Sequence, residues 1–380
     1  MKNILIYRTD LLPASETFIA GQNAALERYS PWFAGLKRDF RGLPVDAARI
    51  VTLTSGDTLR DKLLRRVYLR SGVAPSYHRR IRSLQPALIH AHFAVDACAA
   101  LPLRESLRVP LIVTLHGYDV ASADDSLKQT ALGRTYLHRK GALLRQASLF
   151  LCVSEHIRQR ALERGFPPEK LVVHRIGIDL PDHASQEKRE PVVLFVGRMV
   201  EKKGVLHLIR AMERVESALP DVTLVLLGDG PLRAGLEHEA KKCLRKVLFL
   251  GMQPPGEVRR WMQRARLLVA PSIVAANGDT EGLPTVLCES QAMGLPVVSF
   301  RGPGVNEAVI ADETALLVKQ RDERALGDAI LRLMRDETIQ STLAAAGRRR
   351  AAQLFDVRKQ TALLEEKYDE VLSRFARTGR

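Results

Sequence analysis

The sequence predicts an α/β protein made of two doubly wound parallel-sheet domains. With 380 residues, the chain is longer than one ordinary domain needs. Short apolar runs alternate with helical patterns along its length, which is typical of parallel sheets covered on both faces. The alternation pauses in a polar segment and restarts at Pro191. We therefore expect a domain over 1–183, a linker over 184–190, a second domain over 191–355 and a last helix over 356–380.

The predicted strands are short buried runs. In the first half they lie at 4–7, 87–93, 111–116, 149–154 and 171–176. In the second half they lie at 192–197, 223–228, 247–251, 267–271, 296–300 and 315–318. A helix pattern starts at Leu59, and after residue 321 only helices are expected, the final one over 359–377.

The composition, the apolar runs and the net charge limit the classes of protein to which the chain can belong. The first apolar run is too short for a signal peptide, and no window approaches the roughly 20 apolar residues of a membrane span. Four scattered cysteines show no disulfide or metal spacing, which fits a reducing cytoplasm. The net charge of +15, mostly from the part before residue 183, predicts an anionic partner: phospholipid, nucleic acid or a phosphorylated substrate.

The segment 279–298 carries the clearest chemical signal. It follows one apolar run, precedes another, and is expected to form a loop and then a helix from about Thr285 to Gly294. Glu281 lies in the loop, and Glu289 lies one turn into the helix on the face of Thr285. A helix N-terminus favours anions. Two carboxylates beside it predict a site for an anionic group and several hydroxyls, as in a sugar joined to a nucleotide diphosphate.

These two glutamates, separated by seven residues, have Glu-Gly-Leu-Pro before and Ala-Met-Gly-Leu-Pro-Val-Val after. The pattern resembles the E-x7-E element of the retaining GT-B glycosyltransferases (family 4-like, group 1), and more narrowly their bacterial exopolysaccharide branch. The resemblance implies two Rossmann-like domains facing across a cleft, with the nucleotide sugar in the second domain and the acceptor in the first. It also implies retention of anomeric configuration and a last helix that crosses back to the first domain. The alternative is a surface loop and helix with two unrelated glutamates.

Further donor-side candidates follow the first strands of the second domain. Arg198 and Lys203 lie at a carboxyl edge, where open α/β sheets bind ligands, and could stabilise a leaving diphosphate. Gly228 and Gly230, in a Gly-Asp-Gly-Pro turn, would let a ligand approach the backbone. The alternative is two solvated cations and an ordinary turn. The full donor-binding set implied by the resemblance is Arg198, Lys203, Gly228, Gly230, Gly282, Leu283, Pro284, Thr285 and Glu289.

The resemblance also implies catalytic roles. Glu281 would contact the hydroxyls of the donor sugar, Glu289 the ribose, and the N–H groups around Thr285 a phosphate. His116, in a His-Gly pair at a strand end, would contact the sugar and stabilise oxocarbenium-like charge. A structural histidine in a loop is the alternative for His116.

The acceptor-side candidates are Ser15, Glu16, His92 and Asp119. Many family members have a Gly-Gly loop after the first strand, whereas this chain has Ser-Glu-Thr-Phe-Ile, and Ser15 would also suit a helix N-cap. His90 and His92 share one face of a strand, so a metal is conceivable there. No third ligand and no Asp-x-Asp motif are evident, so we expect no obligatory metal and no cofactor.

The expected reaction moves a hexose from a nucleotide diphosphate sugar to a lipid-linked oligosaccharide or polysaccharide precursor, in exopolysaccharide or lipopolysaccharide biosynthesis. One alternative is a nucleotide-sugar epimerase or hydrolase of the same fold. Another is a nucleic-acid binder, suggested by the basic charge alone; aromatic residues are only 5%, and no recognition motif is present. A third is an inactive scaffold, which the intact charged motifs argue against.

The segment 60–82 contains many cations and one acid, Asp61. A helix from Leu59 would have moderate amphipathicity, with Lys62, Arg65 and Arg66 opposite an apolar face. The apolar face comprises Leu59, Leu63, Leu64, Val67 and Tyr68. The segment predicts a protein that rests on anionic lipid at the cytoplasmic face of the cell membrane without spanning it. A solvated surface helix is the alternative.

Overall fold

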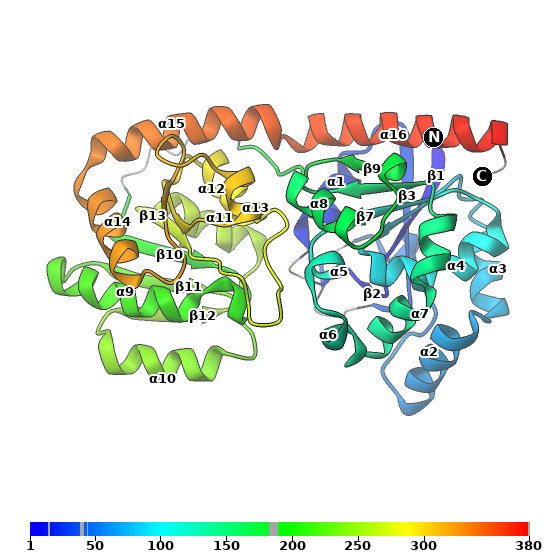
Figure 1. The fold of residues 1–380 in the computed structure, drawn as a ribbon, viewed down its shortest axis with the longest axis horizontal. Coiled ribbons are helices and arrows are strands. Elements are labelled where there is room, and N and C mark those ends of the chain that lie inside the picture. The colour runs from blue at the N-terminus through cyan, green and yellow to red at the C-terminus, as the bar shows by residue number, and fades with distance from the viewer. Residues whose placement is uncertain (14–15, 39–41, 44, 182–188, 379–380) are drawn as a thin grey trace. The chain divides into compact units, whose positions relative to one another are not determined.

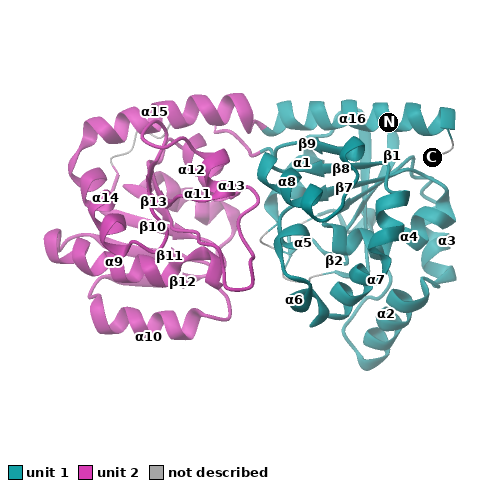
Figure 2. Ribbon diagram, in the orientation of Figure 1, with its two compact units in different colours: residues 1–177, 357–380 teal, residues 178–356 magenta. Residues whose placement is uncertain are grey.

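The computed structural model describes residues 1–13, 16–38, 42–43, 45–181 and 189–378. It divides into two compact units (Figure 2). Unit 1 comprises Met1–Gly177 and Val357–Arg380, and unit 2 comprises Ile178–Asp356. The first division falls before the segment that we expected to be a linker, and most of that segment lies outside the described residues.

Unit 1 is built on a seven-stranded sheet in the order β5-β3-β1-β6-β7-β8-β9. Every pairing in it is parallel. The strands are β1 (Lys2–Tyr7), β3 (Tyr29–Gly35), β5 (Ile50–Thr52), β6 (Ile89–His92), β7 (Leu111–Leu115), β8 (Leu149–Cys152) and β9 (Leu171–Val173). A separate small pair joins β2 (Asp10–Leu11) to β4 (Lys37–Arg38).

The helices of unit 1 connect these strands, as parallel pairing requires. In chain order they are α1 (Thr17–Ala24), α2 (Leu59–Ser71), α3 (Pro75–Arg82), α4 (Ala94–Leu107), α5 (Tyr118–Ala121), α6 (Asp124–Lys128), α7 (Ala131–Gln146) and α8 (Glu155–Glu163). Short 3₁₀ turns cover Ala47–Arg49 and Pro168–Lys170.

The last helix, α16 (Val357–Thr378), follows unit 2 in the chain but packs into unit 1 (Figures 1 and 2). The buried carboxylate of Glu365 accepts from the backbone N–H groups of Glu27 and Arg28 at 3.0 and 2.7 Å. Tyr29 donates its hydroxyl proton to Asp369 at 2.5 Å. These polar contacts fix the position of α16 along its own axis relative to the rest of unit 1.

Unit 2 has a six-stranded parallel sheet in the order β12-β11-β10-β13-β14-β15. Its strands are β10 (Val192–Val196), β11 (Thr223–Leu227), β12 (Val247–Gly251), β13 (Leu267–Ala270), β14 (Val297–Phe300) and β15 (Leu316–Val318). Its helices are α9 (Val205–Ala218), α10 (Arg233–Cys243), α11 (Pro255–Arg264), α12 (Thr285–Ala292), α13 (Pro303–Ala308), α14 (Glu323–Arg335) and α15 (Glu337–Leu354), and a 3₁₀ turn covers Glu201–Lys203.

In each sheet the strand order reverses at one point. In unit 1 the chain builds outward from β1 to β5, then returns to place β6 on the other side of β1. In unit 2 it builds from β10 to β12, then returns to place β13 on the other side of β10. Loops leaving the carboxyl ends at such a reversal diverge, which opens a crevice where α/β proteins bind ligands.

The strands predicted from the sequence are all present, and the region after residue 321 is helical apart from its turns, with α16 close to the predicted 359–377. The prediction missed β3 and β5, and also the two-residue strands β2 and β4. Pro31 lies inside β3 and lacks an N–H group, which normally argues against an inner strand. β5 pairs only with Phe33–Gly35, so at Pro31 the strand has one neighbour, β1. β5 is only three residues long, too short to give a periodic signal.

Each unit has its own apolar core. In unit 2 the core gathers inward-facing residues of β10, β11 and β13 with the buried faces of α9 and α14. In unit 1 it joins β1 and β3 to α1 and includes Leu364, Tyr368 and Val371 of α16. Within the described residues, none of the helices combines the length and apolar character that crossing a bilayer requires.

Candidate active site

The strand reversal of unit 2 brings together two loops that are far apart in the sequence. After β10 the chain enters the turn Glu201–Lys203, and after β13 it enters the loop that contains Glu281. Lys203 Nζ lies 2.6 Å from Glu281 Oε1. Gly204 makes this approach possible: its φ is +64°, and a Cβ there would lie 1.9 Å from the carbonyl oxygen of Pro271. Only glycine fits at this contact.

Glu281 is a buried carboxylate held by several partners. Ser272 donates its hydroxyl proton to Glu281 Oε1 at 3.0 Å, beside the ion pair with Lys203. Burial alone would raise the pKa of Glu281, but Lys203, Lys202 and Ser272 together hold that pKa below its usual value. Lys202 also pairs with Asp279 at 3.1 Å, so adjacent lysines hold the loop at two points. The carboxylate of Glu281 is therefore charged and fixed in position before any ligand arrives.

Glu289 is in a different environment. It lies on α12, as predicted, and is partly buried. Burial raises the pKa of Glu289 to about 7; Arg259 and Lys203 oppose this rise, and Asp179 adds to it. Two carboxylates of one motif thus have pKa values on opposite sides of their common ordinary value. Such divergence is typical of sites in which two acids serve different purposes.

Gly228 and Gly230 meet a constraint that comes from the fold. A Cβ on Gly228, whose φ is +128°, would lie 2.0 Å from the carbonyl oxygen of Gly197. A Cβ on Gly230 would lie 2.5 Å from the carbonyl oxygen of Met199. Both glycines therefore let the turn after β11 pack against the turn after β10.

Arg198 lies between Gly197 and Met199, the two residues that these glycines contact. Its side chain is exposed, and within the described residues it forms no ion pair.

The residues 282–285 connect Glu281 to α12. Gly282, Leu283 and Pro284 are buried, Pro284 stands at the N-cap, and Thr285 opens the helix. The side chain of Pro284 makes no capping hydrogen bond. The N–H of Leu287 donates to the carbonyl oxygen of Pro284 at 3.0 Å, whereas those of Thr285 and Val286 have no acceptor among the described residues and remain available as donors at the end of the loop that carries Glu281.

The strand reversal of unit 1 carries a second buried charge cluster. Arg8, after β1, pairs with Asp96 on α4 and with Glu16, to which its Nε donates at 3.0 Å. Burial lowers the pKa of Arg8, but Asp96 and Glu16 raise it more. Thr9 donates its backbone N–H to Asp96 at 2.8 Å. Glu16, an expected acceptor-side residue, is therefore engaged with Arg8, and Ser15 lies outside the described residues.

Arg8 and Asp96 were not predicted from the sequence. Asp96 had a signal, since it is the one acid in the otherwise apolar start of α4, and an acid buried in such a setting needs a partner. Arg8 directly follows the first strand, at the carboxyl edge that we used to select Arg198. The same reasoning, applied to β1, would have found it.

Three histidines of unit 1, His90, His92 and His116, lie together beside this cluster. His116 follows β7, and its Nε2 lies 3.1 Å from Nδ1 of His92, the last residue of β6. His90 instead bonds Tyr368 Oη and Thr114 Oγ1, each at 2.7 Å. Among the described residues, no group of three or more His, Cys, Asp or Glu side chains is arranged to hold a metal ion.

Asp119 is fully buried, and its carboxylate accepts hydrogen bonds from backbone N–H groups. It accepts from the N–H of Ala94 at 2.8 Å and from the N–H of Gly117 at 3.0 Å. These bonds join the start of α4 to the turn that carries His116. Asp119 thus fixes the position of His116 relative to β6.

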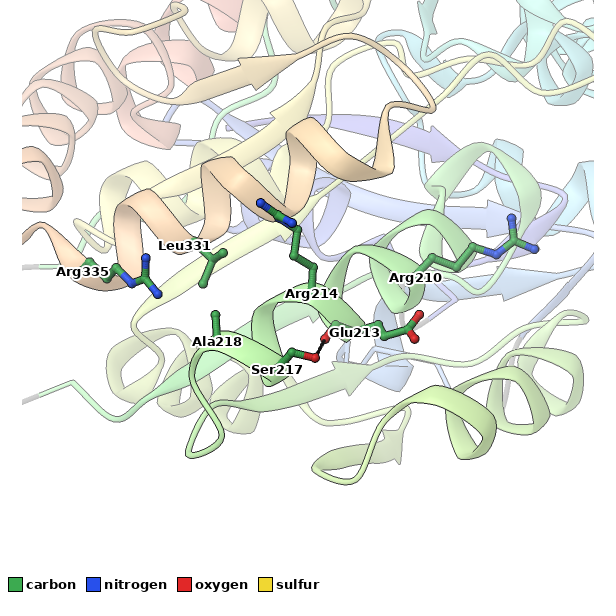
Figure 3. A pocket seen from close by; sticks show the side chains of 7 residues that line it. All are labelled: Arg210, Glu213, Arg214, Ser217, Ala218, Leu331 and Arg335. Atoms are coloured by element: carbon green, nitrogen blue, oxygen red, sulfur yellow. Dashed lines mark hydrogen bonds between the residues drawn. The ribbon is translucent and has the colours of Figure 1, made fainter.

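Unit 2 also has a shallow hollow of about 590 Å³ between α9 and α14 (Figure 3). Its arginines are exposed, and Arg214 pairs with Asp328 at 2.6 Å. None of the residues selected from the sequence borders it. The lining residues are Arg210, Glu213, Arg214, Ser217, Ala218, Leu331 and Arg335. We place the candidate site at the strand reversals because the buried, charge-paired groups are there.

Two family models match the chain. The model described as "Glycosyl transferases group 1" matches residues 180–350, and the model described as "Glycosyltransferase Family 4" matches residues 34–181. Together the two matches span most of both units.

Several known proteins resemble the chain in sequence. A glycosyltransferase of Methanocaldococcus jannaschii is 30% identical over 69% of each chain. AmsK of Erwinia amylovora, an amylovoran biosynthesis glycosyltransferase, is 29% identical over 71% of each. WcaL of Escherichia coli, assigned to colanic acid biosynthesis, is 30% identical over 63% of this chain. That match spans 59% of WcaL, less than two thirds of its length.

A solved structure resembles the fold as a whole. Anabaena HepE in complex with UDP and glucose superposes with a TM-score of 0.76, covering 97% of this chain and 99% of that one at 19% sequence identity. At this identity the likeness establishes the architecture, which is the GT-B fold expected from the sequence.

The first prediction concerns the Lys203–Glu281 pair. Lys203→Met should lower the free energy of unfolding by about 1–3 kcal/mol at pH 7.5, because it leaves a buried carboxylate without its cation. Urea unfolding measures this loss. Arg198→Met, which removes an exposed cation, is the matched control and should change stability little. Lys203→Met with Glu281→Gln should recover part of the loss. A Lys203→Met protein as stable as wild type would contradict the assigned pairing.

The second prediction concerns pH and Glu289. Its folded pKa is raised to about 7, so ionisation opposes folding. This destabilisation is absent below the unfolded pKa near 4.5 and develops as pH rises toward about 7. Glu289→Gln should therefore match wild type at pH 4 and unfold at a higher temperature at pH 8. Thermal unfolding across this range tests it; a stability difference independent of pH would show that Glu289 is ionised normally.

Proposed function

The chain belongs to the group 1 glycosyltransferase family, and from that membership we propose that it transfers a hexose from a nucleoside diphosphate sugar. The proposed acceptor is a lipid-linked oligosaccharide or polysaccharide precursor of a bacterial exopolysaccharide or lipopolysaccharide, and the anomeric configuration is retained. The relatives named for amylovoran and colanic acid biosynthesis support this pathway class. The ion-paired Lys203 and Glu281 at a strand reversal are the observation that carries the proposal.

On the donor side, unit 2 would bind the nucleotide sugar. Lys203 and the exposed Arg198 would neutralise the diphosphate, helped by the free N–H groups at the start of α12. Glu281 would accept hydrogen bonds from sugar hydroxyls, since its low pKa keeps it an acceptor at neutral pH. Glu289 would accept from the ribose hydroxyls. Gly228 and Gly230 would shape the turn beside the nucleotide.

On the acceptor side, unit 1 would supply His116 for contact with the reacting sugar. Glu16 and Asp119 would support this site indirectly, because their carboxylates already serve Arg8 and the backbone of Ala94 and Gly117. His92 would support His116 through their shared hydrogen bond.

We propose that no divalent metal and no cofactor take part. A metal in such a reaction would screen the charge of the departing diphosphate. Here Arg198, Lys203 and the N-terminus of α12 would supply that positive charge. Activity should then persist in excess EDTA.

The third prediction tests the transferase activity. UDP-, GDP- and ADP-sugars are first screened for protection of the protein against thermal unfolding. The enzyme is then incubated with membrane lipid extract and the protective donor, which carries a radiolabel in its sugar. Glu281→Gln should lower kcat by about 10²–10³-fold, the loss for one preorganised group that acts where charge develops. Radiolabel recovered on a lipid would support the transferase activity. Free sugar without transfer would identify a hydrolase, and an isomerised nucleotide sugar an epimerase. A wild-type rate in Glu281→Gln would remove that residue from the site.

The segment around α2 supports membrane association, although its details differ from the expectation. Tyr68 packs inward, whereas Leu59, Leu63 and Val67 are 86%, 60% and 49% exposed. Leu64 and Val73 are exposed as well. A row of exposed apolar side chains on a basic helix suits the interface of an anionic bilayer. We propose that α2 places unit 1 on the cytoplasmic face of the membrane, near a lipid-linked acceptor.

Arg65 is not one of the free cations expected on this helix. Its guanidinium pairs with Asp57 and donates to Thr54 Oγ1 at 2.8 Å and to the carbonyl oxygen of Gly56 at 2.9 Å. It anchors the loop before α2. Arg60, Arg66 and Arg70 of α2 are exposed and available to lipid.

The fourth prediction tests this surface. The protein should sediment with phosphatidylglycerol vesicles at low salt, less so at high salt, because surface charge attraction is screened. Leu63→Gln with Val67→Gln should weaken binding at least about tenfold, since each side chain loses more than about 1 kcal/mol of transfer free energy. Leu232→Gln with Leu248→Gln, two similarly exposed leucines of unit 2, should have no effect. Equal binding by both double variants would rule out insertion of α2.

A further inference from the structure

His92 and His116 form a hydrogen-bonded pair of imidazoles. Their neighbouring strands are in register, with His92 opposite Thr114, so the two rings leave the same edge of the sheet. His92 Nδ1 lies 3.1 Å from His116 Nε2, and the ring planes differ by 25°. A contact between ring nitrogens at this distance requires one proton between them.

Both rings are neutral at physiological pH. Burial lowers the pKa of His92 well below its usual value, and His90, His116 and Arg8 lower it further. Burial likewise lowers the pKa of His116, with Arg8 and His90 adding to the effect. The pair therefore holds two protons on four ring nitrogens. One proton is in the shared bond, and the other must be at one of the two outer nitrogens.

The outer nitrogens are His92 Nε2 and His116 Nδ1. Both are buried and have no hydrogen-bond partner among the described residues. Only two arrangements are possible. In the first, His92 Nδ1–H donates to His116 Nε2, so His116 Nδ1–H is a donor and His92 Nε2 an acceptor. In the second, His116 Nε2–H donates to His92 Nδ1, and the two outer roles are exchanged.

The surroundings hold the rings in place. Phe93 has φ +69° and ψ 132°, a strained backbone for a bulky residue, and its ring centroid lies 4.5 Å from that of His116. Arg8 covers Phe93, with Cζ 4.3 Å from the ring centroid. Phe18 lies 5.1 Å from His116 between centroids. His90, itself bonded at both nitrogens, lies 4.4 Å from His92. Strain of this kind persists where the structure must keep a side chain in one orientation.

We propose that His92 is a positioning residue that sets the tautomer of His116, and thereby decides whether His116 Nδ1 donates to or accepts from a hydroxyl of the bound sugar. The coupling of the two tautomers follows from the geometry of the pair. The identity of the hydroxyl-bearing ligand rests on the proposed function.

The first arm of the test needs no activity. Long-range ¹H–¹⁵N spectra of the protein labelled at histidine report the tautomer of each ring, with His92→Phe and His116→Phe used for assignment. In the wild type we expect both rings as Nδ1–H or both as Nε2–H. One ring of each kind would overturn the proposal, because two protons or two lone pairs would then face each other across the shared contact.

The variants extend this arm. In His92→Phe, the ¹⁵N shifts of His116 should move toward those of an unconstrained imidazole, whereas His92→Asn keeps a polar group near Nδ1 and should keep a single tautomer. His78→Phe is the matched control: His78 Nε2 is also buried without a partner among the described residues, and the loss of that ring should leave His116 unchanged. Unchanged His116 shifts in His92→Phe would overturn the proposal. If His92→Phe does not fold, His92→Asn and the wild-type spectrum decide.

The second arm uses the transferase assay. His92→Phe should lower kcat/KM for the donor sugar about 10–100-fold, the usual loss when the outer partner of a working histidine is removed. Its affinity for the free nucleoside diphosphate should remain, because unit 2 binds that ligand. His92→Asn should recover part of the rate. A tautomer change without a rate change would refute the functional half of the proposal. If the wild type transfers no sugar, the proposed function fails, while the spectra still decide the coupling.

Discussion

The reversal of strand order in each sheet is the constraint on which both candidate sites depend. Parallel strands need long right-handed crossovers, so a doubly wound sheet must at one point change the side on which it grows. At that point two loops leave adjacent strand ends and diverge. In unit 2 these loops carry Lys203 and Glu281, and in unit 1 the segments after β1 and β6 carry Arg8 and Asp96. The strand order brings these charged groups together, although they are 78 and 88 residues apart in the chain.

The two clusters use buried charge differently. In unit 1, Arg8 is shared between two carboxylates and is largely satisfied within the protein, so it supports neighbouring groups. In unit 2, Lys203 and Glu281 have one strong contact with each other, and each has capacity left for further hydrogen bonds. A pair of this kind is rigid before binding and still able to engage a polar ligand. Preorganisation of charge is what a polar reaction needs from its enzyme.

Glycines enforce the close packing of these loops. Gly204, Gly228 and Gly230 each lie where a Cβ would strike a backbone atom of the adjoining loop. The turns after β10, β11 and β13 can therefore pack closely at one edge of the sheet. We interpreted the Gly-Asp-Gly-Pro turn as leaving room for a ligand, but its two glycines are first of all needed for contact between loops. A ligand would then meet a surface that the loops have already shaped.

The sequence by itself determined the class of fold, the strands of the second half, the helix at Thr285 and the two glutamates of the motif. These follow from local patterns, because apolar runs and helix-ending residues act over a few positions. It did not reveal β3, whose Pro31 is tolerated only because β5 starts beyond it. Nor did it reveal that Arg65 is anchored, that Arg8 meets Asp96, or that His92 bonds His116. Those facts depend on strand order and register, which bring distant side chains to the same edge, and no pattern within a short stretch of chain contains that information.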